Sequence, residues 1–270
     1  MSLLAIALGI VVGVSLGLTG GGGAIFSVPL LVYGLGLEPR SAVGVSLVSV
    51  GMTALVGFVQ RWWMAQVELP TGLLFSTAGM IGAPAGAWLS GQIPENILLV
   101  LFAILMGAVA ARMWQSASRA GELSESVNAD AEPAATCQRD ASGTLRLTSR
   151  CARQLVLVGI AAGGLSGLFG VGGGFIIVPA LVIFSRMPIR RAIGTSLLVI
   201  TLVSLSGVAT HLIAGRSFPV DTAVVFSIGG TIGMLFGNRL SGRLAGATLQ
   251  RVFATAMVLV ALFVALRSMA

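Results

Sequence analysis

The sequence predicts an all-α, polytopic integral membrane protein made of two inverted-topology repeats, and three observations lead to this fold class. First, 56% of the residues are hydrophobic, 9% are charged and the mean hydropathy is +1.00. Such a chain has too little polar surface to cover a soluble domain. Second, apolar runs fill nearly everything outside residues 115–153, as membrane-spanning helices require. Third, the chain contains an internal repeat.

The repeat relates the first half of the chain to the second. Residues 17–32 read GLTGGGGAIFSVPLLV, and residues 167–182 read GLFGVGGGFIIVPALV. The register continues downstream, where Gly44 and Ser46 correspond to Gly194 and Ser196. After one inserted residue, the tripeptide at 89–91 recurs at 240–242. Duplicated glycine interruptions of apolar segments are the best sequence indication of a transporter's substrate site.

Each half divides into five apolar segments, which gives a first repeat over 1–115, a polar linker over 116–150 and a second repeat over 151–270. The first two segments of each half are short for a hydrocarbon core of about 30 Å. They form either a re-entrant hairpin or two short crossings, and both alternatives return the chain to its starting side. Each half is thus a glycine-interrupted short-helix hairpin plus three transmembrane helices. The segments are 3–18, 24–36, 41–60, 70–90 and 95–114, then 154–168, 174–185, 191–213, 221–241 and 248–267.

The arginines favour inverted halves. All sixteen basic residues are Arg. An inverted arrangement places thirteen of the sixteen on one face and leaves Arg40, Arg216 and Arg267 on the other. Parallel halves would give nine against seven, and the positive-inside rule prefers the more unequal distribution. We therefore expect both termini outside and the linker in the cytoplasm of a bacterial inner membrane.

The linker holds acidic residues among Ser, Ala and Arg with little apolar periodicity, so we expect a flexible tether. Cys137 and Cys151 lie in it or at its edge, and without His or further Cys neighbours they make no metal site. We interpret them as two incidental thiols.

The glycine clusters at 20–23 and 170–174 are expected to bind an anion. Glycine inside a continuous helix costs about 1 kcal/mol relative to Ala, so such clusters suit a turn or a close backbone approach. An apolar helix follows each cluster, and its N-terminus presents unpaired N–H groups and a partial positive charge. Under inverted symmetry the two clusters meet near the membrane middle. The competing interpretation is that these glycines only permit close helix packing.

Hydroxyl groups near the clusters could add donors, although each could instead bond its own helix backbone. The predicted substrate-binding residues are Thr19, Gly20, Gly21, Gly22, Gly23, Ser46, Gly170, Gly172, Gly173, Gly174, Thr195 and Ser196.

The sequence argues against several function classes, because it lacks the residues that they require. The absence of Lys removes the phosphate-binding loop of ATP-driven transport, and arginines at segment ends differ from a nucleic-acid-binding face. No acidic residue lies deep in an apolar segment, so the usual carboxylate of proton or sodium coupling is missing. His211 is the one histidine, and we interpret it as a structural residue near a segment end. We expect no cofactor.

The string GLSGLFGVGGGFIIVPALV followed by RRAIGTSLLVI, with its first-half counterpart GLTGGGGAIFSVPLLV and RSAVGVSLVSV, resembles the TauE/SafE family of anion permeases. The resemblance covers both halves and implies a secondary transporter, commonly an exporter, for sulfite, sulfonates or related small anions. It points to the two clusters, to Pro29 and Pro179, and to the Gly-x-Ser that follows each cluster. The expected partners are then a small anion and the lipid bilayer, and the resemblance also allows a homodimer.

Two alternatives differ from a carrier. Gly164-Leu165-Ser166-Gly167 matches the context of a rhomboid-type intramembrane serine protease, with His211 as base, but the repeat counterpart of Ser166 is Leu16. A passive anion channel would share the anion site and differ only in gating.

Overall fold

The computed structural model describes residues 2–94, 97–98, 100–101, 104–105, 107–108, 111, 138–139, 145–146, 149–169, 174–185, 187–215, 217–241, 255 and 258. This part of the chain is helical apart from one pair of two-residue strands, and five of its helices are long and apolar enough to cross a membrane. The all-α, polytopic prediction is confirmed. The five helices are α3 (Pro39–Trp63), α4 (Leu69–Ser90), α6 (Ser149–Phe169), α8 (Ile189–Ile213) and α9 (Val220–Ser241).

Shorter helices surround the glycine clusters. The first half has α1 (Ser2–Thr19) and α2 (Gly23–Pro29), which continues as the π-helical turn η1 (Leu30–Gly34), and the second half has α7 (Gly174–Ser185). The segment from Gly23 to Gly34 folds back along α1, because Gly23 packs on the backbone of Leu16 and Gly34 on the side chain of Leu8. The chain thus reverses at the first glycine cluster.

The observed bounds follow the predicted segments closely. Segments 70–90 and 174–185 correspond to α4 and α7. Helix α6 begins at Ser149, before the predicted 154, because arginines are good helix formers and an end of a span need not be apolar. Of the two fifth segments, most residues of 95–114 and 248–267 lie outside the described residues, although those described between 97 and 111, and at 255 and 258, are helical.

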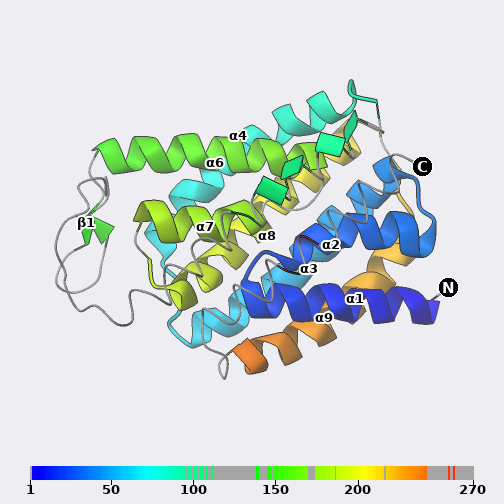
Figure 1. Cartoon of the computed structure of the whole chain (residues 1–270), viewed down its shortest axis with the longest axis horizontal. Helices are drawn as coiled ribbons and strands as arrows, with labels where there is room; N and C mark the ends of the chain where they lie inside the picture. The colour runs from blue at the N-terminus through cyan, green and yellow to red at the C-terminus, as the bar shows by residue number, and fades with distance from the viewer. Residues whose placement is uncertain are drawn as a thin grey trace.

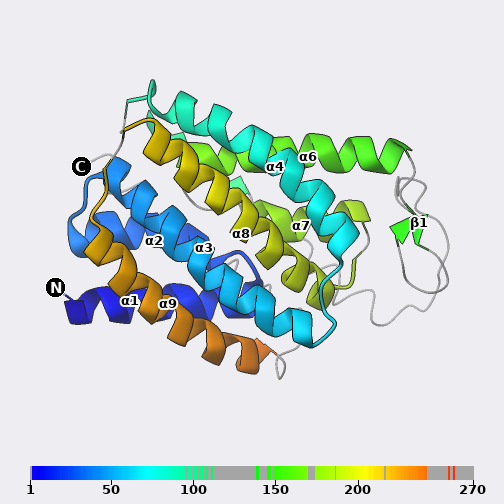
Figure 2. The same ribbon diagram turned by 180° about the vertical axis from the view of Figure 1, so that it is seen from behind.

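The bundle places corresponding helices at opposite edges. Helix α1 lies beside α9 at one edge and α4 beside α6 at the other, with α3 and α8 between them (Figures 1 and 2). Helices α1 and α9 run parallel, since Gly9 packs on Gly230 and Gly17 on Asn238. Helices α4 and α6 also run parallel to each other, whereas α3 and α8 are antiparallel.

Close backbone approach of small residues holds these helix pairs together. A Cβ built on Gly13 would lie 2.0 Å from the carbonyl oxygen of Gly230, so no side chain fits there. In a bilayer, where lipid tails are as apolar as leucine, such van der Waals packing supplies much of the association between helices.

Helix ends of the two halves meet at opposite ends of the bundle. Near the start of α8, Gly194 packs on the carbonyl of Gln66 in the loop between α3 and α4. Near the start of α3, Gly44 packs on His211 and on Phe218 in the loop between α8 and α9. Opposite directions of corresponding helices are what an inverted repeat requires.

The described part of the linker carries β1 (Gln138–Arg139) and β2 (Leu145–Arg146), which pair antiparallel. Cys151, in the first turn of α6, is buried and disulfide-bonded, so the interpretation of two incidental thiols is wrong. Sequence reasoning missed the bond because spacing does not fix which cysteines approach each other. Disulfides persist in oxidising compartments, whereas the arginine distribution predicts a cytoplasmic linker.

Site-directed labelling of a chain in which Ser replaces both native cysteines tests the orientation. We expect a cysteine introduced at residue 130 to react only from the cytoplasm and one added at the C-terminus only from outside, because thirteen of the sixteen arginines then face the cytoplasm. An impermeant maleimide applied to intact cells and to inverted vesicles measures this. Labelling of both positions from one side would contradict inverted halves. Labelling of residue 130 from outside alone would place the linker on the oxidising side of the membrane, where a disulfide persists.

Candidate functional site

The first glycine cluster is a tight break between two helices. Gly20 ends α1, since its N–H donates to the carbonyl of Leu16 at 2.7 Å and its φ of +73° lies in the left-handed region that favours glycine. The hydroxyl of Thr19 accepts from the N–H of Gly22 at 2.9 Å and donates to the carbonyl of Ser15 at 2.7 Å. Thr19 therefore fixes the turn, and α2 starts directly after it.

The two clusters touch each other. A Cβ built on Gly21 would lie 2.1 Å from the carbonyl oxygen of Gly174, and one built on Gly174 would lie 2.6 Å from the Cα of Gly21. Gly174 is the first residue of α7 and also packs on the side chain of Ile200, near the middle of α8. The contact therefore lies deep along the bundle rather than at its ends. The predicted residues Gly170, Gly172 and Gly173 lie outside the described residues.

Two backbone donors of the first cluster have no acceptor among the described residues. Within the described part of the chain, no acceptor receives the N–H groups of Gly21 and Gly23, although the N–H groups of Gly20 and Gly22 are bonded. Both glycines are buried. A buried N–H without a partner costs free energy, so such groups are rare unless something else binds them.

The predicted hydroxyl groups lie in different surroundings. The one hydroxyl hydrogen of Ser196 is shared between the carbonyls of Gly20 at 2.5 Å and Ile193 at 2.8 Å, which ties α8 to the first cluster. Ser46 holds the corresponding position in α3, is fully buried and has no hydrogen-bond partner for its hydroxyl. Thr195 accepts instead from the N–H of Glu68 at 2.9 Å and supports the start of α4.

The serine and histidine of the protease alternative do not form a pair. Ser166 is 1% exposed and its hydroxyl makes no hydrogen bond, so it is not bonded to His211. His211 is buried against Gly44, and its ring lies 6.0 Å from that of Phe218. Among the described residues, no group of three or more His, Cys, Asp or Glu could hold a metal ion.

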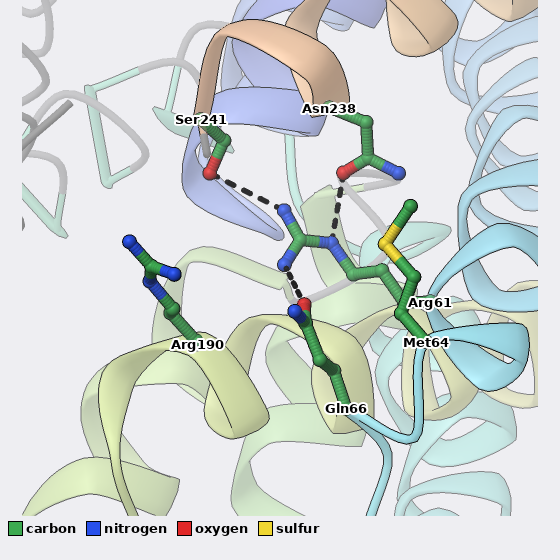
Figure 3. Close-up of a pocket in the computed structure, with 6 residues that line it drawn as sticks. All are labelled: Arg61, Met64, Gln66, Arg190, Asn238 and Ser241. Carbon is green, nitrogen blue, oxygen red and sulfur yellow. Dashed lines mark hydrogen bonds between the residues drawn. The ribbon is translucent and has the colours of Figure 1, made fainter. Parts of the chain in front are cut away.

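A second polar site, which the sequence interpretation did not find, lies at the end of α3. Arg61 is 4% exposed, and its guanidinium donates to four neutral acceptors, the nearest being Asn238 Oδ1 at 2.8 Å (Figure 3). The other acceptors are Gln66 Oε1 at 3.1 Å, the carbonyl of Gly17 at 3.2 Å and Ser241 Oγ at 3.3 Å. A cavity of about 60 Å³ adjoins it, lined by Arg61, Met64, Gln66, Arg190, Asn238 and Ser241.

The sequence held one signal for this site. Arg61 is the repeat counterpart of His211, so the two halves carry different polar residues at one position. The residues that follow it, Trp62 and Trp63, are exposed and typical of a membrane interface, so the local sequence does not mark Arg61 as buried.

The similarity of this chain to known proteins extends over nearly its whole length. The family model described as "Sulfite exporter TauE/SafE" matches residues 5–264. A "Probable membrane transporter protein" of Xylella fastidiosa strain 9a5c is 36% identical over 264 residues, which is 96% of this chain and 93% of the relative. A protein of the same description from strain Temecula1 is 34% identical over 263 residues, again 96% and 93%.

A more distant relative from Bacillus subtilis, also described as a probable membrane transporter protein, is 28% identical over 218 residues, or 78% of each chain. No solved structure matches. The match across both halves identifies this multi-pass membrane transporter as a member of the TauE/SafE family of sulfite exporters.

Proposed function

We propose that the chain is a secondary transporter that exports small anions, such as sulfite and organic sulfonates, across a bacterial inner membrane. The carrying observation is the contact between Gly21 and Gly174, which lies where Gly174 packs on Ile200 near the middle of α8. In the first cluster, the N–H groups of Gly21 and Gly23 have no acceptor among the described residues. Backbone N–H groups at helix starts bind oxyanions without a fixed cation. The family description and its relatives support transport of a small substrate.

The anion would bind in the layer between the two clusters. Gly21, Gly23 and the start of α7 supply backbone donors, and Ser46 supplies a buried hydroxyl with no other partner. Thr19 and Ser196 hold the first cluster in shape by their own hydrogen bonds. In this proposal they position the backbone, and Thr195 belongs to the supporting structure of α4.

The inverted repeat explains how such a site could be reached alternately from both sides. Two halves of opposite direction can rock about a site that both contribute to, which is the usual geometry of alternating access. The described acidic residues lie at helix starts rather than within the spans: Glu38, Glu68 and Asp221. Any proton coupling would then use protonation of the substrate itself.

Flux through the purified full-length chain in proteoliposomes tests the function. We expect saturable, counterflow-competent transport of sulfite or sulfolactate, with thiosulfate, acetate and chloride completing the panel. Gly21→Ala should abolish transport because its Cβ would lie 2.1 Å from Gly174 O, while Gly107→Ala, with nothing within 4 Å of its Cβ, should transport normally.

Normal flux in Gly21→Ala would contradict a site at the glycine contact. Non-saturable flux close to the diffusion limit would instead show a passive channel.

Two alanine variants separate substrate contacts from structural ones. Ser196→Ala loses the bond to Gly20 O and should lower the free energy of unfolding by about 1 kcal/mol. Ser46→Ala loses no bond, so its unfolding free energy should not fall. If Ser46 binds the anion, the half-saturation concentration should rise about fivefold, the equivalent of about 1 kcal/mol. Thermal unfolding in detergent and sulfite flux measure the two effects. An unchanged half-saturation concentration in Ser46→Ala would remove this hydroxyl from the site.

A further inference from the structure

The guanidinium of Arg61 is buried, and none of the described residues that it contacts carries a negative charge. Its four acceptors are two amide oxygens, a hydroxyl and a backbone carbonyl. A guanidinium carries five N–H donors, so one remains after these four bonds. Burying a charge is costly unless an opposite charge or several hydrogen bonds compensate it. The four bonds offset part of this cost and leave the positive charge in place.

Part of the role of Arg61 is structural. The carbonyl of Gly17 belongs to the last turn of α1, where the unpaired carbonyls carry a partial negative charge. Ser241, which also binds Arg61, donates to the carbonyl of Leu18 in the same turn, at 3.5 Å. Arg61 thus caps the helix that leads into the first glycine cluster.

Capping does not explain the second arginine. Arg190 rises from the first turn of α8 and lines the same cavity, with no hydrogen bond drawn to the other lining residues (Figure 3). It is exposed. None of the described residues that line the cavity is acidic. Two guanidinium groups thus share one small cavity whose described lining holds no carboxylate.

The cavity has the dimensions and chemistry of an oxyanion site. A space of this kind needs about 10–15 Å³ to hold a single water, and about 60 Å³ is several times that minimum, which is enough for a small polyatomic anion. Arginine binds planar or tetrahedral oxyanions with paired N–H groups, which a single ammonium cannot do. Asn238 and Ser241 add neutral polar groups to the lining.

The described residues at the opposite end of the bundle do not repeat this arrangement. The repeat counterparts of Arg61 and Arg190 are His211 and Arg40. Asn238 corresponds to Ala87, so the amide that orients Arg61 has no equivalent. The two mouths of a structurally repeated protein therefore differ in their hydrogen-bonding groups, and a buried arginine at one mouth corresponds to His211 at the other.

We propose that the cavity between Arg61 and Arg190 binds the transported oxyanion on its way to or from the glycine contact, and that this station exists at only one mouth of the transporter. This proposal rests on the proposed transport of small anions. The cavity lies close to the first glycine cluster. Arg61 donates to the carbonyl of Gly17, and Gly20 follows three residues later, a rise of about 4.5 Å along a helix. The station would raise the anion concentration next to the deep site at one face.

Arg190→Gln is the informative variant, because Arg190 is exposed and should be removable without unfolding the chain. Its matched control is Arg40→Gln, the repeat counterpart near the start of α3. Sulfite flux is measured in proteoliposomes of uniform orientation, with sulfite offered at each face in turn. We expect Arg190→Gln to raise the half-saturation concentration about tenfold at the face of the loop between α3 and α4 only, as loss of one charge-assisted hydrogen bond would. Arg190→Lys should restore only part of the affinity, and Arg40→Gln should leave this face unchanged.

Equilibrium binding of sulfite to the detergent-purified full chain separates this proposal from the transport function. If wild-type protein binds sulfite with an Arg190-dependent affinity but moves none, the station stands and the proposed transport of sulfite fails. If Arg190→Gln binds and transports sulfite like the wild type, the station is wrong whatever the transport result. Equal effects of Arg190→Gln and Arg40→Gln would also overturn it, because they would indicate general surface charge.

Discussion

The backbone contact between Gly21 and Gly174 is the constraint on which the remaining structure depends. Neither residue has room for a Cβ, so the two helix breaks can approach only as glycines. The contact obliges α1 to end at Thr19, the following segment to fold back along it, and α7 to begin where the breaks meet. Non-helical backbone deep in a membrane protein is stable only where protein or a polar cavity surrounds it. Helix α8 provides part of that enclosure, since Ile193 packs on Gly20 and Ile200 on Gly174.

Charge is arranged around this neutral centre rather than within it. The described acidic residues of the bundle lie at helix starts, and the deeply buried Arg61 caps α1. An anion in the centre would then meet hydrogen-bond donors that carry only partial charges. Such donors bind weakly enough to release their ligand, which a carrier requires, and a full charge at one mouth could bias the side of capture.

Sequence patterns could predict the helices and the clusters because both are local. Hydropathy and the internal repeat locate α4 and α7 to within a residue, and glycine density marks the breaks. The hydrogen-bond or disulfide partner of a side chain often lies on a distant segment, so the sequence could not predict it. Thr195 is adjacent to Ser196 in the sequence, yet it accepts a hydrogen bond at the start of α4. Cys151 is disulfide-bonded. Arg61 lies next to interface-type residues in the sequence, but its acceptors come from α9 and α1. The repeat offered the one clue, since Arg61 and His211 break its symmetry.

Locating a bound anion tests the central claim most directly. Selenite has the shape and charge of sulfite, and selenium scatters anomalously, so crystals of the full chain grown with selenite would reveal its position. The account predicts an anomalous peak within hydrogen-bonding distance of the N–H groups of Gly21 or Gly23 and beside the first residue of α7. A well-occupied peak elsewhere in the bundle, with none at the contact between Gly21 and Gly174, would contradict it.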